Sequence, residues 1–379
     1  MKIAFICPYY EPVVDGPKQA IIEVSKYLTE KGNEVHVYTS DWDKYKRIKV
    51  KEEIIDKEYV HRCFHILRVA NFATVWPSVF FRLMKEDFDI IHTHVSGHAH
   101  VFFASLAAKL KGIKLIHTTH CPWTDAYRGF FGNLLVKVSY NTINRLSFKW
   151  SDKIIAITPW EIQFIEKYGG KGKIEIIPNG VNELFFKKAE KNNFKKDLGL
   201  KGKIVLFFGR LNVTKGVDKL MQVANEIVKE RKDINFLFIG PDEGMKDTLI
   251  KMNQNNKRIK ILDAIKDRKK VREMYQASNV YVLPSFREGL PLTLFEAFAS
   301  GLPVIASPVN GIPYEMTDNE NGFFVEYGDL KNLKEKILKI LDDKKLSEKF
   351  SRNNRKKAQK YKWNDISKKT ERLYKNLLH

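Results

Sequence analysis

The stretch NVYVLPSFREGLPLTLFEAFASGLPVIAS, residues 279–307, contains the pattern that decides the fold. Apolar runs at 279–285 and 303–307 enclose a polar loop and a segment of helical composition. Pro291 suits the first turn of a helix, and Gly301 suits its C-terminal end. A strand, a helix and a second strand in this order predict two parallel strands joined by a right-handed crossover.

The same alternation extends in both directions from this stretch. Further strands are predicted in the second half at 203–209, 235–240 and 258–262, and in the first half at 2–7, 34–40, 89–94, 114–120, 153–158 and 173–178. Polar, lysine-rich residues at 184–202 separate the two series. We therefore expect an α/β protein with two Rossmann-like, doubly wound parallel-sheet domains facing a cleft. The expected domains are residues 1–185 and 200–362, with a C-terminal helix at about 363–379 that packs back on the first.

Composition excludes several classes of protein. Of the 379 residues, 44% are hydrophobic, which supports sizeable cores rather than disorder. No run of about 18 apolar residues is present, so we expect no membrane span, and the N-terminus does not resemble a signal peptide. Three scattered cysteines predict neither a disulfide framework nor a zinc site, which favours a reducing, cytoplasmic compartment. The net charge of +21 favours anionic partners.

The loop after the predicted strand 203–209 carries two cations. Arg210 and Lys215 flank a short turn that opens a helix. Fixed positive charges beside a helix N-terminus suit a diphosphate, because Arg forks two oxygens and Lys adds a point charge. Two exposed loop cations with no ligand are the alternative interpretation.

The loop and helix after the predicted strand 279–285 carry two glutamates. Glu288 lies before the helix and Glu296 lies within it. A carboxylate accepts two hydroxyl hydrogen bonds at once, which suits a ribose or a sugar diol. Leu292 and Thr293 lie in the first helical turn, where free backbone N–H groups can bind phosphate oxygens.

Several of these motifs resemble retaining glycosyltransferase family 4, which has the GT-B fold. The run from Glu288 to Glu296, with EGLP and EAFASGLPVIAS, looks like the family's pair of glutamates separated by seven residues. The segment FFGRLNVTKG at 207–216 is similar to its phosphate-binding loop, and IIPNGVN at 176–182 resembles its interdomain element. Because these motifs are well separated and occur in the right order, they indicate fold and reaction class.

The resemblance implies a set of roles for the donor site. Arg210 and Lys215 would hold the nucleotide diphosphate, with Gly16 approaching the phosphate from the loop after the first strand. Glu296 would bind the ribose hydroxyls. Glu288 and His120, as the catalytic residues, would contact the donor sugar.

The resemblance also implies a reaction. The expected enzyme moves a sugar from a nucleotide-diphosphate sugar, with UDP or GDP as the nucleotide, to a hydroxyl acceptor with retention at the anomeric carbon. It needs no metal and no cofactor. A lipid-linked or cell-surface glycan is the expected acceptor. The protein would be cytoplasmic or peripheral on the inner face of the cell membrane.

The acceptor side is expected near His92 and His94, which end the predicted strand 89–94. Residues 100–150 hold seven basic residues and one acidic residue, and aromatic and aliphatic side chains accompany them at 130–148. We expect an apolar stripe at 130–148 to pack on the sheet with its cations outward. An interfacial helix on an anionic membrane is the alternative.

Other functions stay open at this point. A nucleotide-sugar epimerase, a soluble sugar-phosphate synthase or a non-catalytic sugar-nucleotide sensor would share the fold. The positive charge also suits a nucleic-acid-binding protein. No nucleic-acid-binding module is apparent and aromatic residues do not interleave with the basic runs, so we expect no nucleic-acid partner.

Overall fold

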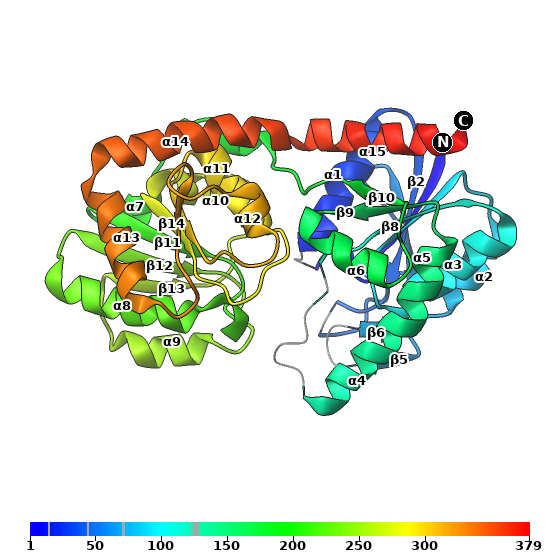
Figure 1. The fold of residues 1–379 in the computed structure, drawn as a ribbon, viewed down its shortest axis with the longest axis horizontal. Coiled ribbons are helices and arrows are strands. Elements are labelled where there is room, and N and C mark those ends of the chain that lie inside the picture. The colour runs from blue at the N-terminus through cyan, green and yellow to red at the C-terminus, as the bar shows by residue number, and fades with distance from the viewer. Residues whose placement is uncertain (14–15, 44, 70–72, 122, 124–128) are drawn as a thin grey trace. The chain divides into compact units, whose positions relative to one another are not determined.

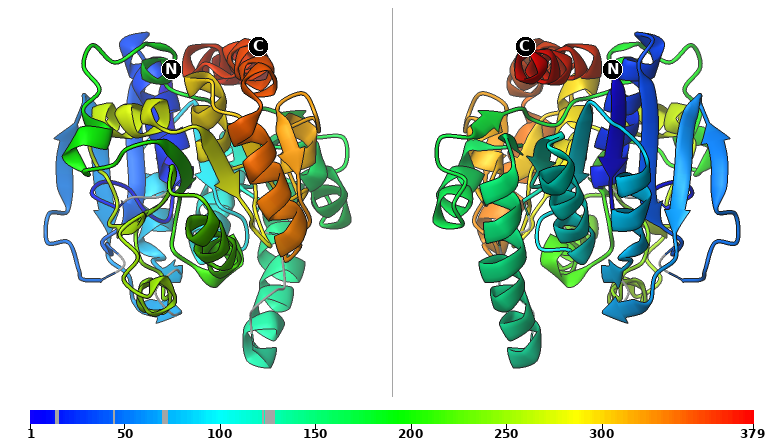
Figure 2. Two further views of the ribbon diagram at one scale, coloured as in Figure 1. Left: turned by 90° about the vertical axis from the view of Figure 1, so that its left-hand side faces the viewer. Right: turned by 90° about the vertical axis from the view of Figure 1, so that its right-hand side faces the viewer.

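The computed structural model describes residues 1–13, 16–43, 45–69, 73–121, 123 and 129–379. The chain divides into two compact units. Unit 1 comprises Met1–Asn179 together with Trp363–His379, and unit 2 comprises Gly180–Lys362. Each unit contains a largely or wholly parallel sheet flanked by helices (Figure 1, Figure 2).

The main sheet of unit 1 has the order β10-β9-β8-β7-β1-β2-β4-β3, in which β3 alone runs antiparallel to its neighbour. Its strands are β1 (Lys2–Ile6), β2 (Glu34–Ser40), β3 (Glu52–Ile55), β4 (Glu58–Cys63), β7 (Ile90–His94), β8 (Lys114–Thr118), β9 (Lys153–Ala156) and β10 (Ile174–Ile176). A separate hairpin pairs β5 (Leu67–Val69) with β6 (Ala73–Val75). Strand β1 is nearly continuous apolar sequence because it lies at the centre of the sheet and is buried on both faces.

The helices of unit 1 are α1 (Gly16–Glu30), α2 (Ser78–Lys85), α3 (Ala99–Lys111), α4 (Phe130–Ser139), α5 (Arg145–Trp150), α6 (Ile162–Lys167) and α15 (Trp363–Leu378). A π-helical turn, Tyr140–Asn144, joins α4 to α5, and a 3₁₀ turn, Pro159–Glu161, precedes α6. Helix α15 packs on α1, and the Tyr27 hydroxyl donates a 3.1 Å hydrogen bond to Glu371. The two ends of the sequence therefore lie side by side in this unit (Figure 1).

The sheet of unit 2 has the order β13-β12-β11-β14-β15-β16 and is parallel throughout. Its strands are β11 (Lys203–Phe208), β12 (Ile234–Ile239), β13 (Ile259–Leu262), β14 (Val280–Leu283), β15 (Val304–Ala306) and β16 (Gly322–Phe324). Its helices are α7 (Phe194–Asp197), α8 (Val217–Glu230), α9 (Lys246–Asn253), α10 (Arg268–Ala277), α11 (Leu292–Ser300), α12 (Ile312–Glu315), α13 (Leu330–Asp342) and α14 (Lys344–Ala358). Short 3₁₀ turns lie at Glu183–Phe186, Val213–Lys215 and Gln359–Tyr361. In the described parts of the chain, no helix has the length and apolar character needed to cross a membrane.

The two predicted series of strands are present, and the two doubly wound α/β units confirm the predicted fold class. Strands β3 to β6 and β16 were not predicted. The hairpin β3–β4 has a charged sequence, and its turn residues Asp56 and Lys57 adopt positive φ values of 48° and 71°. Such a turn favours Asn-Gly, so the sequence gives a weak hairpin signal here. The polar stretch predicted to separate the two series, 184–202, lies in unit 2. It contains α7, and its Phe185 and Phe194 side chains are buried.

The expectation for 130–148 is wrong for its first half. Helix α4 has no buried residue, whereas Tyr140, Asn144 and Phe148 in the following turns are buried. Most of the helix extends away from the rest of unit 1 (Figure 2), although Val136, near its end, packs half-buried against a core cluster that includes Ile154 and Ala156 of β9. Phe130 and Phe131 are 77% and 78% exposed.

Candidate active site

In unit 2, a glycine allows two loops to pack closely together at the carboxyl edge of the sheet. Strands β11 and β14 are parallel neighbours, so the loops that follow them leave the same edge. Gly216, between Lys215 and α8, has φ +63°, and a Cβ atom there would lie 2.0 Å from the Pro284 carbonyl oxygen. The Phe286 N–H donates to the Thr214 carbonyl at 2.9 Å. The loop after β11 therefore rests directly on the loop after β14.

This contact brings together the predicted residues Lys215 and Glu288. The Lys215 Nζ donates to Glu288 Oε1 at 2.7 Å, and the Ser285 hydroxyl donates to the same oxygen at 2.7 Å. The side chains of Lys215 and Glu288 are 12% and 5% exposed. Burial lowers the pKa of Lys215, the Glu288 carboxylate opposes this change, and the positive field of Arg210 adds to it. Lys215 is therefore a largely desolvated cation with a second cation near it.

Arg210 lies on the solvent side of this pair. Its side chain is 54% exposed, and its Nη1 lies 3.0 Å from Glu243 Oε2. A guanidinium in an exposed ion pair is held weakly, because solvent screens the attraction. Arg210 can therefore leave Glu243 and pair with another anion at a small cost in free energy.

Glu296 is buried on α11, with a partner at each carboxylate oxygen. Arg268 donates to Oε1 at 2.8 Å, and the Tyr275 hydroxyl donates to Oε2 at 3.0 Å. Burial and the nearby Glu296 hold the pKa of Tyr275 well above its usual value, so this phenol remains a donor. A carboxylate has about four acceptor positions, so Glu296 retains capacity for hydroxyl groups.

Helix α11 begins at Leu292, and the N–H groups of Leu292 and Thr293 belong to its first turn. Such groups have no carbonyl partner within the helix. The Tyr281 hydroxyl donates to the Phe208 carbonyl at the end of β11 at 3.1 Å and accepts a 2.8 Å hydrogen bond from the Thr293 hydroxyl. These bonds connect the start of α11 to the loop that carries Arg210. The donor-site residues predicted for the second domain thus gather at one edge of one sheet.

Several residues of this site were not predicted from the sequence. Gly216, Ser285, Arg268, Tyr275 and Tyr281 hold the predicted side chains in place. The Lys-Gly pair before a helix is a usable signal for Gly216, because glycine adopts positive φ readily. The two tyrosines carry no such signal, since they come from another helix and from within a strand.

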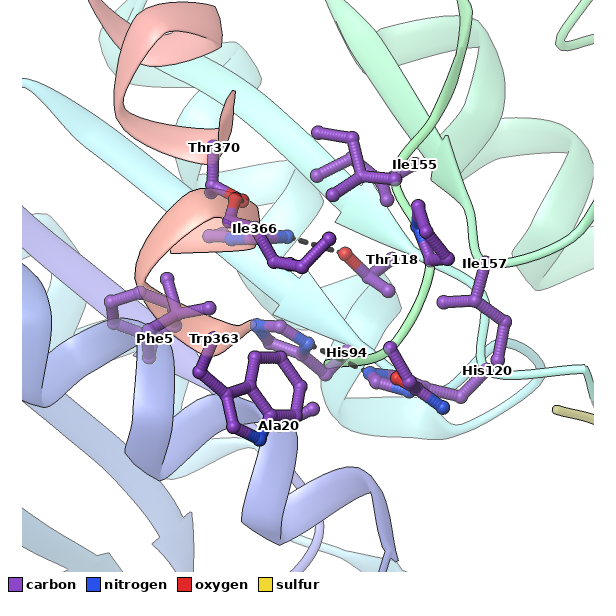
Figure 3. Close-up of a pocket in the computed structure, with 15 residues that line it drawn as sticks. Phe5, Ala20, His94, Thr118, His120, Ile155, Ile157, Trp363, Ile366 and Thr370 are labelled. Atoms are coloured by element: carbon purple, nitrogen blue, oxygen red, sulfur yellow. Dashed lines mark hydrogen bonds between the residues drawn. The ribbon is translucent and has the colours of Figure 1, made fainter. Parts of the chain in front are cut away.

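In unit 1, the predicted His94 and His120 meet beside a pocket. His94 Nδ1 and His120 Nε2 are 3.0 Å apart. Phe5, Ile155 and Trp363 form part of the apolar wall, which combines side chains from the sheet with α1 and α15 (Figure 3). Burial keeps the pKa of His94 well below its usual value, so its ring is neutral near pH 7.

The remaining predicted residues of unit 1 have different surroundings. His92 lines the same pocket, but both of its ring nitrogens have partners: Tyr374 at 2.6 Å and Thr118 at 2.7 Å. Gly16 is exposed at the first position of α1, and a Cβ there would meet no atom of the described residues within 4 Å. The acceptor role of His92 and His94 and the phosphate role of Gly16 stay predictions.

Two acidic pairs in unit 1 have the spacing for a shared cation. Asp87 and Asp89 flank Phe88 before β7, but Asp87 pairs with Lys111 and Asp89 accepts the Lys2 N–H.

Asp41 and Asp43 flank Trp42 after β2, but Asp41 is bound by Arg47 and by His65. Asp43 accepts hydrogen bonds from backbone N–H groups two and three residues further on. Within the described residues, no three His, Cys, Asp or Glu side chains form a group suited to a metal ion.

Comparisons with known proteins identify the family. A model of Glycosyltransferase Family 4 matches residues 14–183, and a model of Glycosyl transferases group 1 matches residues 188–357. The UDP-Gal:alpha-D-GlcNAc-diphosphoundecaprenol alpha-1,3-galactosyltransferase of Escherichia coli is 31% identical over 279 residues, which cover 71% of this chain and 70% of that protein. The phosphatidylinositol N-acetylglucosaminyltransferase GPI3 subunit of Saccharomyces cerevisiae is 25% identical over 388 residues, 99% of this chain and 83% of that protein.

A solved structure supports the same fold. The sucrose-phosphate synthase of Thermosynechococcus elongatus matches with a TM-score of 0.78 and 20% identity, covering 100% of this chain and 99% of that chain. Fold, motifs and relatives agree along both units. The chain belongs to glycosyltransferase family 4 and is a glycosyltransferase with the GT-B fold.

Proposed function

We propose that this glycosyltransferase moves a sugar from a nucleoside-diphosphate sugar to a hydroxyl of a lipid-linked glycan, with retention at the anomeric carbon. The buried Lys215–Glu288 pair carries the proposal, because it holds a desolvated cation against the loop that leads into α11. A diphosphate would gain strong charge-assisted hydrogen bonds there.

In the proposed donor site, Arg210, Lys215 and the N–H groups of Leu292 and Thr293 hold the diphosphate. Glu296 accepts hydrogen bonds from the ribose hydroxyls. The diphosphate gains negative charge as the bond to the sugar breaks, and these fixed donors stabilise that charge. Since they supply the positive charge themselves, no metal ion is needed. EDTA should therefore leave the transfer rate unchanged.

Of the remaining roles, two concern the sugar and one concerns the phosphate. Glu288 and His120 contact the donor sugar, and Gly16 approaches the phosphate. The acceptor hydroxyl attacks the anomeric carbon from the face that the phosphate leaves, and its proton passes to a departing phosphate oxygen. The new glycosidic bond replaces the bond to phosphate, so configuration is retained and no enzyme nucleophile is required.

The names of two relatives support the substrate classes. The E. coli relative is named for UDP-Gal and for a diphosphoundecaprenol acceptor, and the yeast relative is named for phosphatidylinositol. Both names contain a lipid-anchored acceptor. We therefore infer a UDP-sugar as the first donor to test and a lipid-linked glycan as the acceptor class.

Helix α4 supports peripheral attachment to an anionic membrane. Phe130, Phe131 and Leu135 are exposed on it, and the exposed cations Lys137 and Arg145 accompany them. Residues 129–150 contain no acidic side chain. Apolar side chains insert at the lipid boundary while cations face anionic headgroups. Such attachment would bring the enzyme to an acceptor that resides in the membrane.

Variants of the proposed donor site test the assignment. Lys215→Ala and Glu296→Ala should each weaken UDP binding about tenfold or more, because each removes charge-assisted hydrogen bonds. The matched control is Lys219→Ala, which removes a lysine of α8 that pairs with Asp218 at 3.3 Å. Titration calorimetry measures the affinities. Unchanged affinity in both site variants would refute the assignment.

Donor and product analysis separates the remaining alternatives. Thermal unfolding with UDP-, GDP- and ADP-sugars identifies the donor, because a bound ligand raises the stability of the folded state. Turnover of the donor without acceptor to an epimer would instead indicate an epimerase. Binding of the donor with no turnover under any acceptor condition would indicate a sensor.

A further inference from the structure

A buried glutamate in unit 1 fixes the loop that carries His120. Glu161 lies in the 3₁₀ turn after β9 and is fully buried. Its Oε1 accepts three hydrogen bonds from the segment after β8: Thr119 Oγ1 at 2.5 Å, the Cys121 N–H at 2.8 Å and Trp123 Nε1 at 2.9 Å. These donors lie on both sides of His120 in the sequence.

The second carboxylate oxygen anchors the glutamate to its own strand. Glu161 Oε2 accepts the Ile157 N–H at 2.8 Å, directly after β9. Strands β8 and β9 are parallel neighbours, so one carboxylate connects the ends of both. A buried carboxylate without such partners would be strongly destabilising, so the four donors and the carboxylate stabilise one arrangement together.

The loop needs this support because its backbone is strained. His120 and Cys121 have φ values of +60° and +53° in succession. Non-glycine residues in this region cost about 1 kcal/mol or more each and persist only where surrounding contacts fix them. The two residues follow Thr119 and precede Trp123, whose side chains both donate to Glu161. Hydrogen bonds to the Glu161 side chain therefore hold the chain on both sides of the strained backbone.

We propose that Glu161 is a positioning residue for sugar transfer, acting through His120. The inference rests on the proposed function, in which the His120 ring contacts the donor sugar. Glu161 holds the backbone of His120 in its left-handed conformation, and His94 meets the ring at 3.0 Å. The carboxylate sets the position of the imidazole and does not touch the substrate.

The closing experiment compares wild type, Glu161→Gln, His120→Ala and the double variant. The assay measures release of UDP from UDP-galactose, or from the sugar nucleotide that stabilises the protein most. Glutamine keeps the shape but places an NH₂ group against either the three donors at Oε1 or the one at Oε2, so at least one hydrogen bond is lost. Glu161→Gln should lower kcat about 10- to 100-fold, since a small misplacement of a reacting group has that effect. The affinity for free UDP should stay within about twofold, because Lys215 and Glu296 are unaltered.

In the His120→Ala background, Glu161→Gln should change kcat by no more than about twofold, because the side chain through which it acts is absent. An equal loss in both backgrounds would overturn the inference and leave the proposed function intact. A full rate in Glu161→Gln with a reduced rate in His120→Ala would also overturn the inference and leave the proposed function intact. A full rate in His120→Ala would overturn the role of His120 and this inference together.

Two further variants separate positioning from loss of stability. Glu58→Gln is the matched control, since Glu58 is also buried in unit 1 and accepts hydrogen bonds from Tyr10 and Ser25. It should lower thermal stability without lowering kcat. Thr119→Val removes one donor to Glu161 and serves if Glu161→Gln does not fold. A normal kcat in Thr119→Val, in that case, would contradict the inference.

Discussion

At the residue scale, Gly216 sets the distance between the two loops of the proposed donor site. We expect Gly216→Ala to lower the free energy of unfolding by about 2–5 kcal/mol, combining the cost of positive φ with overlap against Pro284. The matched control is Gly199→Ala, because Gly199 also has φ +63° and a Cβ there meets no atom within 4 Å. The control should cost about 1 kcal/mol. Urea unfolding measures both, and equal losses would contradict the proposed close approach.

Lys215 gives the site a pH dependence. Its pKa lies below the usual 10.5 because it is buried, so it loses its proton as pH rises through a value below 10.5. UDP affinity should therefore fall with rising alkaline pH. The unfolded state binds more protons in this window, so Lys215 itself adds stability with rising pH and unfolding does not explain the loss.

The control for this pH effect is Lys215→Arg, because a guanidinium stays charged throughout. Its UDP affinity should be lower at neutral pH but should not show the same alkaline decline. Calorimetric titrations from pH 7 to about pH 10 would test this. Identical pH profiles in the two proteins would exclude Lys215 as the titrating group.

At the element scale, α4 shows that a sequence pattern can predict a helix without predicting whether its apolar side is buried. The residues at 130–150 form a continuous helical run, but the burial begins only at Tyr140. Spacing of apolar residues indicates an apolar side, whereas the direction of the helix relative to its sheet decides whether that side is covered.

The proposed membrane role of α4 predicts a specific loss. Phe130→Ser combined with Phe131→Ser should reduce flotation with vesicles that contain anionic lipid by about tenfold or more, since two aromatic side chains no longer insert. The control is Ile54→Ser combined with Ile250→Ser, which removes exposed apolar side chains on β3 and α9. Equal flotation of both double variants would refute α4 as the membrane contact.

At the scale of the whole molecule, unit 1 is completed by the last helix of the chain. Helix α15 follows the whole of unit 2 in sequence, and its Tyr374 hydroxyl shares a 2.6 Å hydrogen bond with His92 in the sheet. Both side chains are buried. This contact joins residues that are 282 positions apart.

Removing this contact should destabilise unit 1. Tyr374→Phe leaves a buried histidine nitrogen without its partner, which costs about 1–3 kcal/mol. Tyr27→Phe is the control, because the Tyr27–Glu371 bond between α1 and α15 is only partly buried and should cost no more than about 1 kcal/mol. Urea unfolding followed by tryptophan fluorescence measures both. A larger loss in Tyr27→Phe would contradict the assigned role of the His92–Tyr374 bond.

The sequence by itself determined the α/β class, most of the strands and the position of several polar residues after β11 and β14. Buried parallel strands require apolar runs, and loops at their carboxyl ends collect polar side chains such as Arg210 and Glu288. These are local patterns, so they are visible without the fold. Tertiary structure alone decided that Lys215 pairs with Glu288, that Glu161 holds the His120 loop and that α4 leaves Phe130 and Phe131 exposed. Each depends on which distant segments meet, and no local spacing encodes that.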